Sequence, residues 1–284
     1  MRNFLIYGMA FVVSLAMLLT ACKKDDSKPD NSGNNNNQET PGGSEVTPNQ
    51  EYPETSVVLP QAVTDIDGNT YDAVQIGDQV WMAENLRTTR YSDGTTIPLD
   101  STYSGIEPFR YAPGPSSGNN EENMANVARY GYLYNWCAVM HGAVSSDINP
   151  SGVQGICPNG WHVPSDAEWM ELTNYMKTQP TYMAGGNPDN LAKALAATWG
   201  WNSSSVTDAP GNNPSTNNAT GFSALPAGVY FGQILEGRYG LFNFSALFWS
   251  ATATNQYAIN HNRSDVDIWL DYRDDGASVR CVRD

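Results

Sequence analysis

Gly155-Ile-Cys-Pro-Asn-Gly-Trp-His-Val-Pro-Ser-Asp-Ala-Glu-Trp169 is the stretch of the chain that decides the fold. Pro164 fixes its own φ angle and favours an extended backbone at the residue before it. Ser165 and Glu168 have the spacing of a capping box, which predicts a helix that begins near Asp166. One stripe of this helix is expected to face a core, because apolar side chains recur at helical spacing: Trp169, Leu172 and Tyr175 or Met176.

The composition limits both the domain organisation and the partners. The 284 residues are 40% hydrophobic, which is enough for one sizeable domain. Thirty acidic and fifteen basic residues give a net charge of -15, which repels polyanions and excludes nucleic acid as a general partner. Most of the eight Trp and fifteen Tyr are expected in the core, and the rest would be available for a binding surface.

The first residues have the pattern of a signal peptide. Arg2 precedes an uncharged run from Phe4 to Ala21, and a cysteine follows it in Leu19-Thr-Ala-Cys22. This run resembles the bacterial lipobox, in which the peptidase cuts before Cys22 and lipid is attached to that residue. We therefore expect a lipoprotein signal peptide over 1–21 and an anchor in outer-membrane lipid through Cys22. A membrane-spanning helix stays open, since about 18 apolar residues are the lower limit for crossing a bilayer.

Residues 22–54 are expected to form a tether. They are rich in Asn, Gly, Pro, Ser, Thr and acidic residues and have hardly an aliphatic side chain, so they cannot bury enough surface to fold. Lys23-Lys-Asp-Asp-Ser27 resembles the signal that sends lipoproteins of Bacteroides-type bacteria to the cell surface; a solvated charge run is the alternative. The folded domain is then expected over 55–284.

The domain begins with an alternation of apolar and polar residues from Val63 to Met82. Asp67-Gly68 and Gly77-Asp78 are two-residue turn signals within it, so two short β-hairpins are expected. Asp93-Gly94 is a further hairpin signal. The segment Asp65–Asn69 also invites a calcium-loop interpretation, but two essential ligand positions of that loop would hold valine, so a turn is the better interpretation.

Helices and strands are expected further along the chain. Gly142 follows the segment Tyr130–His141 and is typical of the end of a helix. The aromatic residues of this segment are expected in the core with Trp161: Tyr132, Tyr134 and Trp136. A second helix is expected over Asn190–Ala197, with an inward face formed by Leu191, Ala194 and Leu195. Four later segments are expected to form strands of one antiparallel sheet: 221–230, 247–252, 267–272 and 277–282.

Three motifs occur in a fixed order, Tyr132-Leu-Tyr-Asn-Trp136, the run from Cys157 to Trp169, and Ser278-Val-Arg-Cys-Val-Arg-Asp284. Together they resemble the Fibrobacter succinogenes major paralogous domain over roughly Val63 to Asp284. In its C-terminal part that family is similar to the C-type-lectin and formylglycine-generating-enzyme folds. The resemblance implies an α+β fold with a mixed, mostly antiparallel sheet, two helices and long irregular loops, preceded by short β-hairpins.

The resemblance also implies a disulfide bond between Cys157 and Cys281. Both cysteines lie in the matching motifs, and the expected compartment is oxidising. Cys137 is then left over in the apolar run Trp136–Met140, where a free buried thiol is expected to behave as a small hydrophobic residue. Asp100-Ser101-Thr102 resembles a short O-glycosylation acceptor in a surface loop.

The residues that usually carry catalysis or bind metals are not arranged for either role. His141, His162 and His261 are scattered, and the sequence has no zinc-protease, nucleophile-elbow, phosphate-loop or Cys-x-x-Cys motif. Formylglycine-generating enzymes hold copper through paired cysteines near their C-terminal end, where this chain has only Cys281. We therefore expect no enzyme activity, no catalytic residue, and no metal or other cofactor.

Trp269, Asp271 and Arg273 are the predicted ligand-binding residues. In an extended segment they point to one side, while Ile268, Leu270 and Tyr272 point to the other and are expected to fill the core. An indole, a carboxylate and a guanidinium suit a sugar. Trp269-Leu-Asp271 also resembles the Trp-Asn-Asp run of calcium-dependent lectins, although the Asn is missing. The alternative is that Trp269 is a core residue and that Asp271 and Arg273 pair at the surface.

The sequence thus favours a non-catalytic surface module that binds a glycan or a protein, or mediates adhesion. Two alternatives from other classes stay open. One is a structural or assembly subunit of the cell envelope, such as a pilus-tip-like component. The other is a glycan hydrolase with Asp271 and Asp274 as its carboxylate pair, although acidic residues are abundant enough for chance proximity.

Overall fold

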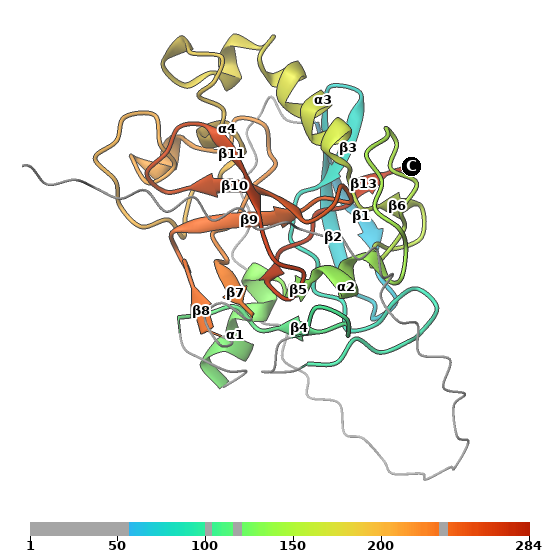
Figure 1. The fold of residues 1–284 in the computed structure, drawn as a ribbon. Helices are drawn as coiled ribbons and strands as arrows, with labels where there is room; N and C mark the ends of the chain where they lie inside the picture. Colours follow the sequence, from blue (N-terminus) through green and yellow to red (C-terminus); the bar gives the residue numbers. More distant parts are fainter. Residues whose placement is uncertain (1–56, 100–103, 116–120, 233–237) are drawn as a thin grey trace, which may run out of the picture.

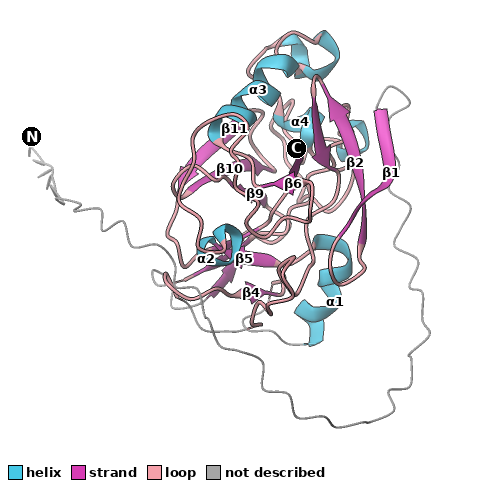
Figure 2. Ribbon diagram, turned by 90° about the vertical axis from the view of Figure 1, so that its right-hand side faces the viewer, coloured by secondary structure: helices cyan, strands magenta, loops and turns pink. Residues whose placement is uncertain are grey.

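The computed structural model describes residues 57–99, 104–115, 121–232 and 238–284. The predicted signal peptide over 1–21, the tether over 22–54 with Cys22, and the Asp100-Ser101-Thr102 acceptor lie outside the described residues. The described chain has an α+β fold, as predicted, with three sheets of antiparallel strand pairs and four short α-helices (Figures 1 and 2).

The first sheet begins as a three-stranded meander, which confirms the two predicted hairpins. Gly68 and Gly77 occupy the two turns with φ angles of 82° and 63°, a region that favours glycine. The last strand of the chain then pairs with the third strand of the meander and with a short strand from the middle of the chain. In sheet order, the strands are β1 (Val57–Thr64), β2 (Thr70–Ile76), β3 (Gln79–Met82), β13 (Val282–Arg283) and β6 (Trp161–His162).

The other two sheets are built mainly from the C-terminal third. One contains β11 (Val266–Leu270), β10 (Asn255–Asn260) and β9 (Ser245–Trp249), in that order. The other contains β4 (Arg110–Tyr111), β5 (Leu133–Asn135), β12 (Gly276–Ala277), β7 (Val229–Phe231) and β8 (Arg238–Gly240).

The prediction of a single antiparallel sheet for the four C-terminal segments is wrong. Strands β12 and β13 have only two residues each, and the backbone between them meets β9: the Ser278 N–H donates to the Leu247 carbonyl, and the Trp249 N–H donates to the Ser278 carbonyl. The chain from Val266 to Arg283 therefore contributes β11, β12 and β13 to three different sheets.

The helices are α1 (Glu121–Tyr130), α2 (Trp136–Met140), α3 (Asp166–Met176) and α4 (Ala192–Leu195), with 3-10 turns at Pro180–Tyr182, Ala184–Gly186 and Pro214–Thr216. Helix α3 begins where it was predicted, and both hydrogen bonds of the Ser165–Glu168 capping box are present. Helix α4 is shorter than predicted, because Ala196 is extended and pairs with Ala224. Helix α2 is also short, since Leu133–Asn135 forms β5 before it.

Two large apolar clusters lie on opposite sides of the sheet formed by β9, β10 and β11. Ala258 of β10 belongs to one cluster, and Tyr257 and Ile259 of the same strand belong to the other. The residues predicted for the core are buried: Tyr132, Tyr134, Trp136, Trp161, Leu191, Ala194 and Leu195. In α3 the core residues are Trp169, Leu172 and Met176, whereas Tyr175 is 37% exposed.

The cysteines follow the prediction in part. Cys157 and Cys281 form the predicted disulfide bond, with 6.0 Å between their Cα atoms. The prediction of a free thiol at Cys137 is wrong, because this buried residue is disulfide-bonded as well.

Candidate functional site

The predicted ligand-binding residues share one side of the chain, but that side faces inward. Trp269 is partly buried against the core, and its Nε1 donates to Oδ2 of Asp267 at 3.2 Å. The side chains that were expected to fill the core are instead 49%, 79% and 52% exposed: Ile268, Leu270 and Tyr272. The aliphatic residues of this edge strand do not identify its buried side, because an apolar cluster packs on each face of the sheet.

Arg273 is partly buried and contacts an aromatic ring. Its guanidinium carbon is 4.6 Å from the centre of the Trp136 ring, a cation–π contact. Asp271 is hydrogen-bonded to the side chain of Asp275. The indole, carboxylate and guanidinium therefore do not form one open face, and ligand binding by Trp269, Asp271 and Arg273 stays a prediction.

Asp271 and Asp275 form a carboxyl pair in the segment after β11, in which Asp275 is buried and Asp271 is partly buried. Burial raises the pKa of Asp271. Burial and the charge of Asp271 raise the pKa of Asp275 to about 7. A hydrogen bond of 2.7 Å from the Gly232 N–H acts in the opposite direction and lowers this pKa. The glycosidase alternative was based on Asp271 and Asp274, whereas the carboxyl group bonded to Asp271 is that of Asp275.

His162 is the most buried of the three histidines and lies between two carboxylates. Its Nε2 is 2.5 Å from Glu168 and its Nδ1 is 2.6 Å from Asp284. Burial alone would lower the pKa of His162, but the two hydrogen-bonded carboxylates raise it overall. His162 and Asp284 also line a hollow of about 400 Å³. Both ring nitrogens are occupied, so neither can take a proton from a molecule bound there.

The remaining candidates for chemistry have structural partners. His141 stacks on Tyr91 with 3.6 Å between ring centres, and His261 meets the ring of Phe244 edge to face. Segment 65–69 is a turn, as predicted, since the Asp65 carboxylate accepts the N–H groups of residues 67 and 69. In the described part of the chain, no group of three or more His, Cys, Asp or Glu side chains could hold a metal ion.

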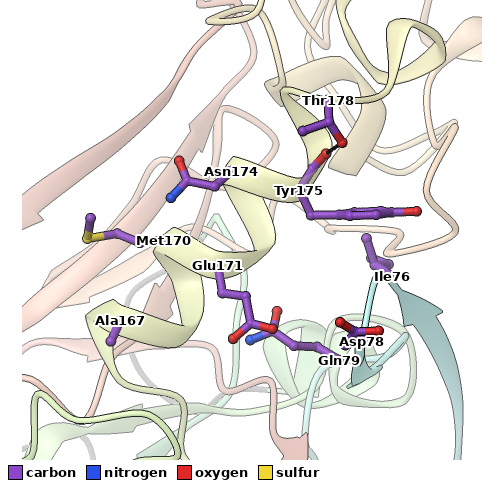
Figure 3. A pocket seen from close by; sticks show the side chains of 9 residues that line it. All are labelled: Ile76, Asp78, Gln79, Ala167, Met170, Glu171, Asn174, Tyr175 and Thr178. Atoms are coloured by element: carbon purple, nitrogen blue, oxygen red, sulfur yellow. Dashed lines mark hydrogen bonds between the residues drawn. The ribbon is translucent and has the colours of Figure 1, made fainter.

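A groove that the sequence did not reveal runs along α3 (Figure 3). It has a volume of about 620 Å³ and lies between the outer stripe of α3 and the β2–β3 turn. The Tyr175 ring packs on that turn: a Cβ atom added to Gly77 would lie only 2.9 Å from Cγ of Tyr175. The lining side chains are Ile76, Asp78, Gln79, Ala167, Met170, Glu171, Asn174, Tyr175 and Thr178.

The groove combines an apolar surface with oxygen-rich polar groups. Met170 and Tyr175 are 56% and 37% exposed, and none of the nine lining residues is basic. Glu171 extends from α3 toward the turn (Figure 3). It accepts a hydrogen bond from Asn149. The side chains of Asp78 and Asn174 make no hydrogen bond to other described residues, so their polar atoms can serve a ligand.

One sequence signal for this groove existed. Residues 167, 170, 171, 174 and 178 recur at helical spacing beside the buried stripe of α3, and Met170 places a large apolar side chain on this outer face. The other wall could not be found in this way, since it depends on the contact between Tyr175 and Gly77, which are far apart in the sequence.

Comparisons with known proteins give the family of the chain. The searches of curated proteins and of solved structures found no match. The model of the Fibrobacter succinogenes major domain matches residues 74–283, which include α3, both cysteines of the disulfide bond and the wall of the groove from Ile76 to Gln79. The chain therefore belongs to the Fibrobacter succinogenes major domain family.

Proposed function

We propose that this chain is a lipid-anchored surface protein that binds a glycan without transforming it, in the groove along α3. The observation that carries the proposal is the pairing of a partly exposed Tyr175 ring with the unoccupied polar groups of Asp78 and Asn174. A sugar offers apolar C–H faces that stack on a ring and hydroxyl groups that donate to carboxylate and amide oxygens. A protein ligand, which the sequence also favoured, is the alternative to a glycan.

The charge of the groove narrows the glycan class. Asp78 and Glu171 bring two carboxylates to the lining, with no basic residue among the nine. Such a surface repels sulfated or uronic-acid polymers and favours neutral sugars or amino sugars. Glu171 comes from α3 and Asp78 from the facing β2–β3 turn, and the groove between them is open, which suits a chain of several sugar units better than a single enclosed ring.

A glycan array tests this proposal. Asp78→Ala and Asn174→Ala remove groups that make no hydrogen bond to the described chain, so they should reduce binding without loss of stability. Tyr175→Ala should cost at least about tenfold in affinity if the ring is the stacking surface. Glu107→Ala is the control, since it removes an exposed carboxylate outside the groove. We expect the signal to survive a chelator; binding that all three groove variants leave intact would contradict the site.

The anchor is a second part of the proposal and rests on the sequence. No helix in the described residues is long and apolar enough to cross a membrane. Cys22→Ser is expected to release the protein from the outer membrane, and shaving of intact cells with protease is expected to remove it. A lipidated Cys22 sulfur cannot also form a disulfide bond, so a Cys22 peptide that carries no lipid in mass spectrometry, whether unmodified or disulfide-linked, would contradict the anchor.

A further inference from the structure

Both walls of the groove along α3 present hydrogen-bond acceptors to a ligand. The Asp78 carboxylate, on the β2–β3 turn, has no hydrogen-bond partner among the described residues. The Glu171 carboxylate extends toward that turn from α3 (Figure 3). Its Oε2 receives the Asn149 amide at 2.5 Å, which leaves its Oε1 for a ligand. An ionised carboxylate accepts hydrogen bonds and donates none, so this pair requires a ligand that donates.

Two of the side-chain donors that line the groove are already used within the fold. Gln79 is buried, and its Nε2 donates to the Glu168 carbonyl at 3.0 Å while its Oε1 receives a buried indole N–H at 3.0 Å. The Thr178 hydroxyl donates to the Tyr175 carbonyl at 2.7 Å. The side-chain donors left for a ligand are the Asn174 amide and the Tyr175 hydroxyl. Acceptors therefore dominate the recognition surface.

The charge around the groove favours a cation. None of the nine lining residues is basic, and α3 itself contains no Lys or Arg. Lys177 directly follows α3, but its amino group lies 3.3 Å from the Asp189 carboxylate, and it does not line the groove. The net charge of -15 adds a long-range attraction for cations. A positively charged ligand group therefore meets two carboxylates and no competing cation in the lining.

We propose that the groove selects glycans that carry a free, protonated amino group, such as unacetylated hexosamines, over their N-acetylated and neutral counterparts. This inference rests on the proposed glycan function and names the sugar class for the same site. An ammonium group brings three N–H donors and a positive charge to Asp78 and Glu171, and hydrogen bonds between charged groups are the stronger ones. The apolar face of the sugar ring stacks on Tyr175.

The chemistry of the amino group explains the discrimination. Acetylation removes the positive charge, leaves a single N–H donor and adds a carbonyl acceptor. Opposite Asp78 and Glu171 this carbonyl meets acceptors instead of donors, and a desolvated acceptor without a partner costs free energy. A hydroxyl group in the same position donates one hydrogen bond but carries no charge. The expected order of affinity is therefore amine, then hydroxyl, then N-acetyl.

Matched oligosaccharides test this order. Short oligomers of glucosamine, glucose and N-acetylglucosamine, in both α-linked and β-linked series, differ within a series only in one substituent of each ring. Their affinities for the full chain are measured by titration calorimetry at physiological salt, which screens the general attraction of an acidic protein for cations. We expect the free-amine oligomer to bind about fivefold more tightly than the glucose oligomer, and at least about tenfold more tightly than the N-acetylated one.

Two isosteric variants locate the selection in the groove. Asp78→Asn and Glu171→Gln remove one charge each, and Gln keeps an acceptor for Asn149. Each should lower the affinity for the amine about fivefold. The double variant should bind the N-acetylated oligomer more tightly than the wild type does, because its amides can donate to the acetyl carbonyl. Glu107→Gln is the matched control, since it removes a carboxylate of the same charge outside the groove and should change neither affinity.

The possible failures separate the two proposals. Glucose or N-acetylated oligomers that bind the wild type as tightly as the amine would overturn the amine selection and leave the glycan groove in place. Amine binding that Asp78→Asn and Glu171→Gln leave unchanged, or that Glu107→Gln lowers equally, would overturn it too, because general attraction to an acidic chain would then be the cause. A wild type that binds none of these oligomers and no member of the glycan array would overturn both proposals.

Discussion

The Nε2 atom of His162 lies 2.5 Å from Oε1 of Glu168, the residue that completes the capping box of α3. Its Nδ1 atom lies 2.6 Å from Oδ1 of Asp284. One buried imidazole therefore joins β6 to the start of α3 and to the residue that follows β13. Two ionised carboxylates on one ring favour the doubly protonated imidazolium.

The contribution of His162 to stability is expected to depend on pH. Its pKa is raised above the ordinary value of 6.5, because the two carboxylates outweigh the effect of burial. A base with a raised pKa in the folded state stabilises fully below the unfolded pKa, and this contribution is lost as the pH rises through the folded pKa. The free energy of unfolding, measured with urea, should fall above about pH 6.5 more steeply in the wild type than in His162→Gln. Equal slopes would rule out this linkage.

Arg280 is expected to be among the residues most sensitive to substitution. It is fully buried and donates to Asn85 Oδ1 and to the carbonyl oxygens of Met82, Phe222 and Ser223. Arg280→Met should cost about 3 to 5 kcal/mol, because it leaves these buried acceptors without a donor. Arg283→Met, at an exposed position outside that network, is the control and should change stability by less than about 0.5 kcal/mol. A small effect of Arg280→Met in thermal unfolding would contradict the structural role.

Trp269→Ala distinguishes a packing role from a ligand role. Trp269 packs against the core only in part, so its truncation should cost about 2 kcal/mol, less than a fully buried tryptophan. Glycan binding through the groove should be unchanged once the lower stability is allowed for. Loss of binding with unchanged stability would instead restore Trp269 as a ligand residue, as the sequence predicted.

The features predicted correctly from the sequence are mostly those determined by residues close together in the chain. The start of α3 depends on Ser165 and Glu168, which are three residues apart, and the two hairpins depend on turn residues inside a short alternating run. The prediction of the Cys157–Cys281 bond rested on motifs whose order resembles that of a family. The match to the family model confirms that resemblance.

The errors arise where distant parts of the chain decide the structure. Alternation along β11 separated Trp269 from Ile268 and Leu270 correctly, but a sheet with a core on both faces gives no sequence signal for the inward side of its edge strand. The groove has the same origin, since Gly77 and Tyr175 meet only in the fold. Helix α4 was predicted too long because the pairing of Ala196 with Ala224 overrides the helix propensity of alanine.

Asp275 is expected to weaken the fold at neutral pH. Burial, with the nearby Asp271 charge, raises its pKa from 3.8 to about 7. Between these two values the folded chain binds this proton more tightly than the unfolded chain does, so stability falls as the pH rises from 3.8 to about 7 and then levels off. Asp275→Asn cannot ionise and keeps an acceptor for the Gly232 N–H, which Oδ1 now receives at 2.7 Å.

Asp275→Asn should therefore be more stable than the wild type at neutral pH, and its urea-unfolding free energy should fall less between pH 3.8 and about pH 7. Asp265→Asn provides the opposite control, because the hydrogen bond from Arg263 lowers the pKa of Asp265. Its carboxylate stabilises above the unfolded pKa and loses this contribution as the pH falls, so its replacement should weaken the fold at neutral pH. If Asp275→Asn also weakened the fold at neutral pH, the Asp275 carboxylate would have to be stabilising, contrary to its raised pKa.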